Sequence, residues 1–239
     1  MVASASVQDN WRTMLARTFS RDLAGVWDTH KEIVRFKIGE GGGSGGSPIT
    51  PDSTFTDLQG EGEAQTGVCG FVNGSKIVTG VGTAFLTDFS PGDWIKPGAR
   101  TTGAPSVSPY APGYPGTEYD EWGEIDTVDN DLQITLLSNY TGATTPENRP
   151  PMKASEPLYV FRKTLSASDV LFHSANPAIA EVTTLVAAGE ANSDQLGNNP
   201  DFYEIGLFDE DGVMVAYCTF DLQTKVSGVQ LVTVIELIY

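Results

Sequence analysis

The chain has 239 residues, with 14 Lys and Arg against 31 Asp and Glu, and a formal net charge of -17. So acidic a surface repels phosphate backbones, which excludes nucleic-acid binding through a broad basic footprint. Hydrophobic residues make up 40% of the chain, and 26 Gly and 14 Pro among many Thr, Val and Ile favour strands and turns over helices.

Targeting and redox features are few. No run of about 18 apolar residues predicts a membrane span, and the N-terminal letters MVASASVQDNW lack the order of a signal peptide. Cys69 and Cys218 have no paired spacing, so neither a zinc site nor a disulfide framework is indicated. We expect both as buried small side chains, with one bridge as the alternative. A protein made in a cytoplasm, with no metal and no cofactor, is therefore predicted.

Residues 5–27 carry the one good helical pattern. Apolar side chains recur at helical spacing, and charged side chains lie mostly on the other side, which predicts an amphipathic helix. This helix either covers an open face of the protein's own sheet or binds a partner or lipid surface. In the partner reading its apolar stripe is an assembly interface, formed by Trp11, Met14, Leu15, Phe19, Leu23 and Trp27.

The next segments predict short strands separated by loops. The letters EIVRFKIGEG, residues 32–41, alternate as in a half-buried strand. The glycine-rich run 39–48 is too flexible to pack and predicts a surface loop. Further strands are predicted at 69–74, 75–80, 93–98, 122–128 and 132–137, with loops at 101–120 and 141–157.

The C-terminal part predicts longer strands. The stretches 158–165 and 178–190 each read as one strand, and 202–220 reads as a hairpin around a four-residue turn that ends in Gly212. The last strand, 228–239, is apolar on both faces and is predicted to lie centrally in a sheet.

This segmentation predicts a mainly β protein, sandwich- or barrel-like, with an N-terminal amphipathic helix. Residues 1–66 and 158–239 would form a discontinuous outer domain. Residues 67–157 would form a small β-barrel module inserted into it, because insertions enter at loops whose ends lie close together.

Glycines near threonines in IVTGVGTAFLTDFSPGDWIKPG, residues 77–98, raise the question of a phosphate loop. No Gly-Lys-Ser/Thr follows, and no βαβ unit opens there, so neither a Walker motif nor a dinucleotide fingerprint is present. Gly80 and Gly82 are instead predicted to let the chain turn at a barrel corner, with Phe85 and Phe89 filling the core.

Other candidate sites are weak in the sequence. Asp209, Asp211 and Gly212 resemble part of a calcium loop, but the later acidic ligand is missing, and a plain hairpin turn is favoured. Asp129 and Asp131 are interpreted in the same way. The two histidines lie in no catalytic motif. One cluster of acidic residues lies beside Tyr119 and Trp122. We favour its interpretation as a solvated acidic surface over a pair of catalytic carboxylates as in a glycosidase. The cluster and the histidines comprise Glu118, Asp120, Glu121, Glu124, His30 and His173.

Two stretches show a resemblance. Residues 77–98 with GEIDTVDNDLQITL, 123–136, resemble a small β module found in phage tail-fibre and other virion proteins, although the loop 99–121 is longer than in that pattern. The matching positions are Gly80, Gly82, Thr83, Phe85, Gly92, Asp93, Ile95, Ile125, Val128, Asp131, Leu132 and Ile134.

The outer segments are similar to the N-terminal domain of phage tail-collar fibre proteins. The residues that carry this resemblance are FKIGEGG, YVFRKTL, and FYEIGLFDEDGVMVAYCTF followed by TKVSGVQLVTVIELIY. The chain ends at Tyr239 without the long shaft of that family, which favours a collar, neck, tail or baseplate adaptor over a whole fibre.

The resemblances imply a structural virion protein, not an enzyme, that forms a symmetric ring with copies of itself and contacts other tail, neck, baseplate or fibre proteins. No nucleic acid and no membrane is expected as a partner. One alternative is a receptor- or glycan-binding module, in which Tyr110, Tyr114, Tyr119 and Trp122 of the loop 100–122 stack on sugars or on a protein. Another alternative is a hydrolase that uses the acidic cluster, with Glu124 as its test position.

Overall fold

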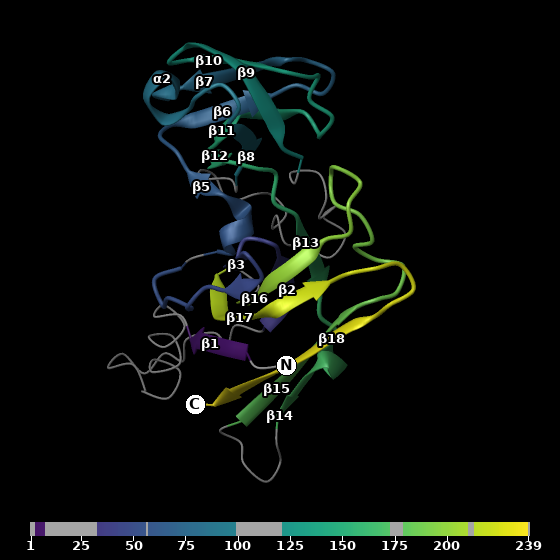
Figure 1. The fold of residues 1–239 in the computed structure, drawn as a ribbon. Coiled ribbons are helices and arrows are strands. Elements are labelled where there is room, and N and C mark those ends of the chain that lie inside the picture. Colours follow the sequence, from purple (N-terminus) through teal and green to yellow (C-terminus); the bar gives the residue numbers. More distant parts are fainter. Residues whose placement is uncertain are drawn as a thin grey trace, which may run out of the picture. The chain divides into compact units, whose positions relative to one another are not determined.

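The structure, a computed structural model, is mainly β, as the composition predicts. The chain divides into two compact units (Figure 1). Unit 1 comprises Met1–Leu58 and Phe161–Tyr239, and unit 2 comprises Gln59–Val160. The described residues are 3–7, 33–55, 57–98, 121–172, 179–209 and 213–238.

The sequence places the start of the inserted module at residue 67, whereas unit 2 begins at Gln59. The short strand β5 (Glu63–Ala64) explains the difference, because it pairs with β12 (Pro151–Ala154) at Ala64↔Met152. Residues that precede the glycine motif are thereby joined to the sheet of unit 2.

Unit 1 contains a five-stranded sheet in the order β1-β17-β16-β2-β13 (Figure 1). The predicted hairpin is confirmed, since β16 and β17 pair antiparallel along most of their length. β2, far away in the sequence, pairs with the other side of β16. The bounds are β1 Ala3–Val7, β2 Ile33–Gly39, β13 Val160–Thr164, β16 Asp201–Asp209 and β17 Met214–Thr224.

Strand β2 is buried on both faces, so the prediction of a half-buried strand is wrong. Phe36 and Ile38 are buried on one face, and Arg35 and Lys37 are buried on the other. The Lys37 ammonium tolerates burial because its Nζ lies 2.7 Å from the Asp57 carboxylate. A buried charge needs such a partner.

The glycine-rich run packs against β16, which corrects the prediction of a loop too flexible to pack. It forms a small hairpin of β3 (Gly43–Ser44) and β4 (Ser47–Pro48). A Cβ on Gly42 would lie 2.3 Å from Cβ of Glu204, and one on Gly43 would lie 2.3 Å from the Tyr203 ring. Glycine is required at both positions because the backbone approaches its neighbours so closely.

A separate three-stranded sheet has the order β14-β15-β18. The strands are β14 (Val170–Phe172), β15 (Ile179–Val186) and β18 (Leu231–Ile238). The sequence places the last strand centrally, but β18 lies at the edge of this sheet. Its apolar residues therefore divide between a buried face and an exposed one.

Helices are short in the described part of the chain, and none of them is both long and apolar enough to cross a membrane. The prediction of a helix over 5–27 is wrong at its start, because residues 5–7 belong to strand β1. β1 pairs with β17, for example at Ala5↔Cys218. The rest of that prediction lies outside the described residues. The helical elements are η1 Gln59–Glu61, α2 Phe85–Asp88 and η2 Ala167–Asp169.

Unit 2 contains one eight-stranded sheet in the order β11-β6-β7-β10-β9-β8-β12-β5. Hairpins join β6 to β7 and β9 to β10, as their alternating sequences predict. The remaining bounds are β6 Val68–Phe71, β7 Ile77–Val81, β8 Trp94–Pro97, β9 Gly123–Asn130, β10 Gln133–Leu136 and β11 Thr145–Arg149.

The predicted barrel is not closed. β11 and β12 lie in the stretch 141–157, which the sequence predicts as a loop. β11 is the strand at one edge of the sheet, and β12 lies next to the strand at the other edge. Pro150 separates the two strands and Pro151 begins β12, and neither proline has an N–H to donate to a ladder. The register of β11 against β6 also shifts between Thr145 and Arg149. The sheet therefore stays open at this point.

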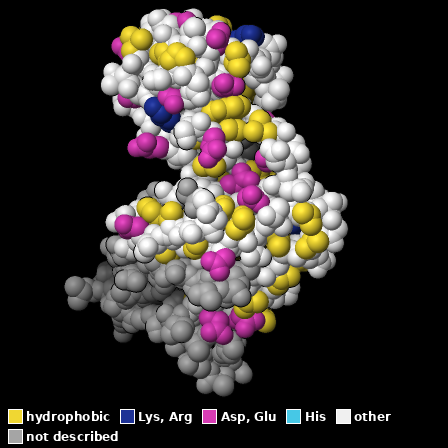
Figure 2. Space-filling model, viewed as in Figure 1, with side chains coloured by type: hydrophobic (Ala, Val, Ile, Leu, Met, Phe, Trp, Pro, Cys, Tyr) yellow, Lys and Arg dark blue, Asp and Glu magenta, His cyan; other side chains and the backbone are white. Residues whose placement is uncertain are grey.

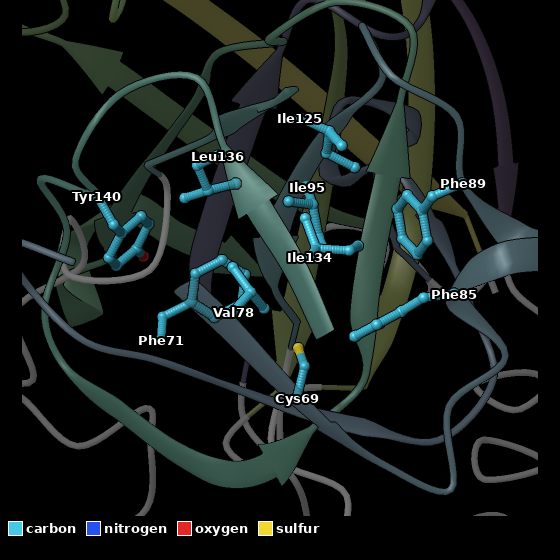
Figure 3. Close-up of a cluster of buried hydrophobic side chains, with 10 residues drawn as sticks. All are labelled: Cys69, Phe71, Val78, Phe85, Phe89, Ile95, Ile125, Ile134, Leu136 and Tyr140. Atoms are coloured by element: carbon cyan, nitrogen blue, oxygen red, sulfur yellow. The ribbon is translucent and has the colours of Figure 1, made fainter. Parts of the chain in front are cut away.

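The core of unit 2 is formed by buried side chains from several strands of this sheet and from α2 (Figure 3). Phe85 and Phe89, at the two ends of α2, pack edge to face with ring centroids 5.7 Å apart. Both rings are buried, which confirms the role predicted for them. The other members of the cluster are Cys69, Phe71, Val78, Ile95, Ile125, Ile134, Leu136 and Tyr140.

Gly80 makes the closest approach in this core and allows a test. A Cβ there would lie 2.2 Å from Oγ1 of Thr83 and 2.9 Å from the Phe85 ring. We expect Gly80→Ala to lower the free energy of unfolding by about 1–3 kcal/mol through overpacking, measured by urea denaturation. Gly189→Ala is the control, because open space surrounds Gly189; it should change stability by less than about 1 kcal/mol. Equal stability of both variants would contradict the packing role.

Candidate functional site

The glycine-threonine motif serves the backbone. Gly82 has a φ of 64°, in the left-handed region, and carries the chain from β7 towards α2. The hydroxyl of Thr83 donates to the carbonyl oxygen of Asp131, and the Asp131 carboxylate accepts the Leu86 N–H at 3.2 Å. Asp131 thus joins α2 to the β9–β10 turn, as part of a hydrogen-bonded corner.

Asp129 organises polar side chains on the exposed surface of β9 and β10. Its carboxylate accepts hydrogen bonds from Thr135 at 2.7 Å, Gln133 at 3.0 Å and Thr127 at 2.9 Å. These donors, Thr135 first, hold the pKa of Asp129 below its usual value. The carboxylate therefore acts as a cross-strand acceptor.

Asp209 closes the β16–β17 hairpin. Its buried carboxylate accepts the Val213 N–H at 2.8 Å, while its own N–H donates to the Val213 carbonyl at 3.0 Å. Asp211 and Gly212 lie outside the described residues, as do both histidines. No group of three or more His, Cys, Asp or Glu side chains is arranged to hold a metal ion in the part of the chain that the structure describes.

The aromatic loop contributes one described residue, Trp122, and its side chain is 3% exposed. The indole N–H donates to the Leu158 carbonyl at 3.0 Å, and Nζ of Lys96 lies 4.6 Å from the ring centroid. Trp122 therefore packs inside unit 2 and does not present a stacking surface for sugars. The other predicted loop residues, Tyr110, Tyr114, Tyr119, Glu118 and Asp120, lie outside the described residues.

Glu121 and Glu124 are the members of the predicted acidic cluster that the structure describes, and both contact neighbouring loops or strands. The Glu121 carboxylate accepts the Thr141 hydroxyl at 3.4 Å. The Glu124 carbonyl accepts the Leu137 N–H at 2.8 Å, and Glu124 itself pairs with Trp94 in the β8–β9 ladder. These contacts fit a rim that joins strands.

Buried polar pairs are the feature that sequence reasoning missed. Nζ of Lys96, which is buried, lies 2.9 Å from Oε2 of Glu61. Strand alternation places Lys96 on the face opposite Ile95, but nothing in the letters DWIKPG shows that Trp122 and Glu61 cover that face. Low-dielectric surroundings make each such pair costly to break.

Unit 1 contains a second buried pair. The Tyr217 hydroxyl donates to Oε2 of Glu204 at 2.7 Å, and both side chains are fully buried. Burial, and then the Glu204 charge, raise the pKa of Tyr217 above its usual value. Phe55 packs edge-on against the Tyr217 ring with centroids 5.4 Å apart. The pair fixes β16 to β17 from within the sheet.

The candidate functional surface is the outer face of the β14-β15-β18 sheet. The register places Leu171 beside Glu181 and Glu236, and places Leu185 beside Val232. On the inner face of β15 and β18, the buried apolar side chains are Ala180, Val182, Val186, Ile235 and Leu237. On the outer face, the exposed fractions are 53% for Leu171, 38% for Leu185, 53% for Val232 and 52% for Val234. These six residues are called the outer face below.

Two features make the outer face unusual for a solvated sheet. Large apolar side chains stand where a half-exposed strand normally carries polar ones. Glu181 and Glu236 also lie directly opposite each other, and such like-charge pairs are unfavourable. Acidic side chains are spread over the surface drawn in Figure 2, whereas basic ones are few. A covering group with apolar character would suit this face.

The predicted assembly stripe, Trp11, Met14, Leu15, Phe19, Leu23 and Trp27, lies outside the described residues. Comparison of the chain with protein-family models, curated proteins and solved structures finds no match. Function is therefore inferred from the chain's own residues and their arrangement.

Alkaline pH tests the Tyr217–Glu204 pair. A raised pKa means that the folded state keeps the phenol proton, so this stability is full below about pH 10 and is lost above it. Cys218, whose pKa burial raises to about 11, acts in the same direction. We expect the urea midpoint of the wild type to fall more steeply between about pH 8.5 and 10.5 than that of Tyr217→Phe. Parallel curves would refute the role given to the phenol.

The Lys96–Glu61 pair is tested by a double-mutant cycle. We expect Lys96→Met to destabilise the protein by about 3–5 kcal/mol, because it leaves the Glu61 carboxylate buried without that cation. Adding Glu61→Gln should restore part of the loss, as seen in urea denaturation of the single and double variants. Additive losses would show that the two side chains are not coupled.

Proposed function

We propose that the protein is a structural component of a bacteriophage particle. It assembles with copies of itself into a symmetric ring at the collar, neck, tail or baseplate and provides an attachment point for fibres. The observation that carries this proposal is the outer face, an apolar sheet surface exposed in a single copy of the chain. Exposed apolar patches on sheets mark contact surfaces with other macromolecules.

The edge position of β18 supports the same function. Edge strands present unpaired backbone groups, and natural proteins usually protect them with charges, prolines or bulges. β18 has eight residues, Leu231–Ile238, and its one charged residue is Glu236. A long apolar edge beside an apolar face is suited to burial in an assembly.

The charge distribution favours contacts between copies. Residues 181–239 contain ten acidic residues and one basic residue, whereas residues 1–40 contain five acidic and six basic residues. In a ring, an acidic region of one copy can meet a less acidic region of the next. This complementarity offsets the repulsion that a net charge of -17 on each copy would otherwise cause.

The family resemblance adds support from the residues that carry it. Phe85, Ile95, Ile125 and Ile134 of the module pattern are core residues of unit 2. The Glu-Ile-Gly-Leu-Phe-Asp letters form β16, the strand between β17 and β2. The residues of both motifs thus build the core and the sheets of the two units, as expected for a structural module of a virion.

Sedimentation velocity and mass photometry test the assembly. We expect the wild type to form one closed oligomer, and Val232→Asp/Val234→Asp to shift the population towards monomers by about tenfold or more, because charges replace buried apolar contacts. The matched control is Val72→Asp/Leu132→Asp, at equally exposed positions in unit 2, which should leave the oligomer unchanged.

A wild type that stays monomeric at all concentrations, or that is missing from purified particles of the phage that encodes it, would refute the proposal. A fixed copy number per particle, measured by quantitative mass spectrometry, would support a ring.

A further inference from the structure

We infer that Lys225 and Asn192 of unit 1 form an intramolecular isopeptide bond, in which the lysine amine displaces ammonia from the asparagine amide. Lys225 directly follows β17, and Asn192 lies in the loop between β15 and β16. The inference goes beyond the proposed function and does not depend on it, because the bond forms within one copy of the chain.

Lys225 is a buried lysine with uncharged partners. Its side chain is 0% exposed. Nζ donates to Oδ1 of Asn192 at 2.5 Å, and to the carbonyl oxygens of Val226 at 3.2 Å and Ala188 at 3.4 Å. No carboxylate of the described residues forms a salt bridge with it. Lysine is almost never fully buried unless it is paired with an opposite charge, so this placement points to a further role.

The Asn192 amide is held with its oxygen towards the lysine. Its Nδ2 donates to the Ala188 carbonyl at 3.0 Å, which distinguishes the amide nitrogen from the oxygen. The preceding residue, Ala191, has a φ of 49°, in the left-handed region that residues with a Cβ rarely adopt. Backbone strain of this kind clusters at functional sites. Here it occurs in the loop residue next to the reacting amide.

Glu190 fixes the same loop and supplies a neighbouring negative charge. Its carboxylate accepts the Ala187 N–H at 2.8 Å and pairs with Nζ of Lys163 at 2.8 Å. Burial opposes ionisation of Glu190, but Lys163, the Ala187 N–H and the Lys225 charge together hold its pKa below the usual value. An ionised carboxylate that interacts with Lys225 is thus present to receive the proton that a nucleophilic amine has to lose.

The distances are those of a reactive pair. Because Nζ lies 2.5 Å from Oδ1 of Asn192 and a C=O bond is about 1.23 Å long, Nζ lies no more than about 3.7 Å from Cγ. Reacting atoms in near-attack geometries are about 3–3.5 Å apart. The χ2 torsion of asparagine is broad, so a small rotation turns Cγ towards the amine. An amide is a weak electrophile, but holding the two groups in place is equivalent to a concentration of about 10⁵–10⁸ M.

The reaction is a transamidation that balances without an oxidant or a reductant. Nζ of Lys225, as the neutral amine, forms a bond with Cγ of Asn192. The bond between Cγ and Nδ2 breaks, and Nδ2 takes one of the two Nζ protons and leaves as ammonia. The product is a secondary amide between the two side chains. It closes a loop that contains β16 and β17, and such a cross-link restricts the unfolded chain as a disulfide does.

Trypsin digestion of the denatured full chain tests the bond. Lys225 is the only Lys or Arg after Lys163, so an unmodified chain releases the fragments 164–225 and 226–239. Trypsin does not cut after a lysine whose amine has become an amide. We expect residues 164–239 of the wild type as one fragment, lighter than its sequence by one ammonia. The yield of fragment 226–239 should be about tenfold or more lower than in Lys225→Arg.

Two variants serve as matched controls. Lys225→Arg keeps the charge and the donors but has no amine that can attack, and trypsin still cuts after arginine. Asn192→Ser keeps a polar oxygen and removes the amide carbon. Both variants should have the full mass of their sequences and release fragment 226–239. In the wild type, a protease that cuts after Glu190 and Glu204 should leave the peptides that contain Asn192 and Lys225 joined.

The inference is overturned if the wild type, stored folded for days at neutral pH, has the full mass of its sequence and releases fragment 226–239 as completely as Lys225→Arg. It is also overturned if Asn192→Ser blocks cleavage as the wild type does. Loss of ammonia with Lys225 still cleavable counts against it too, since Asn73, which precedes Gly74, can lose ammonia by closing on the backbone. Sedimentation of the same samples decides separately on the ring.

Discussion

The antiparallel ladder between β2 and β16 is the constraint on which the architecture depends. It joins Gly39 to Glu204 and Ile38 to Ile205, so the whole of unit 2 is contained in the loop between two paired strands. Closing so long a loop has an entropic cost that grows only slowly with length. The ladder offsets that cost because β16 is paired on both sides and almost completely buried. A polar side chain that this strand buries has a hydrogen-bond partner: Glu204 accepts the hydroxyl of Tyr217.

Close backbone approach is the second organising constraint, and it recurs in both units. Gly42 and Gly43 lie against β16 in unit 1, and Gly80 lies against Thr83 and Phe85 in unit 2. In a sequence with 26 glycines, these positions differ from those that merely permit a turn. The glycine-rich stretches thus specify contact distances, which explains how motifs that suggest phosphate loops instead build joints between strands.

Much of the β structure follows from alternation and turn residues. The β16–β17 and β9–β10 hairpins are examples, because their apolar alternation flanks recognisable turn residues. β11 and β12 escaped prediction because a proline-rich stretch resembles a loop unless its neighbours are known. The burial of Lys37 was missed for a related reason: its partner, Asp57, is 20 positions away and meets it only through the fold.

The candidate surface was hidden in the sequence by an ambiguity. A strand that is apolar on both faces predicts a central position, but the same letters suit an edge strand whose second face is covered by another segment. β18 lies at the edge of its sheet, and its second face, which carries Val232 and Val234, is exposed. Trp122 gives the opposite case. It follows a loop rich in tyrosines, but its ring is buried under Lys96, which pairs with Glu61, and no local sequence pattern indicates this burial.

The positions of the two cysteines have a practical consequence. Cys69 lies in the core of unit 2 and Cys218 in β17 of unit 1, and both thiols are buried. A thiol reagent can reach each sulfur only when the surrounding unit opens, so the rate of labelling at each one measures local opening. The chain thus contains one natural reporter in each unit, and the opening of the insert and of its host can be timed separately in the same tube.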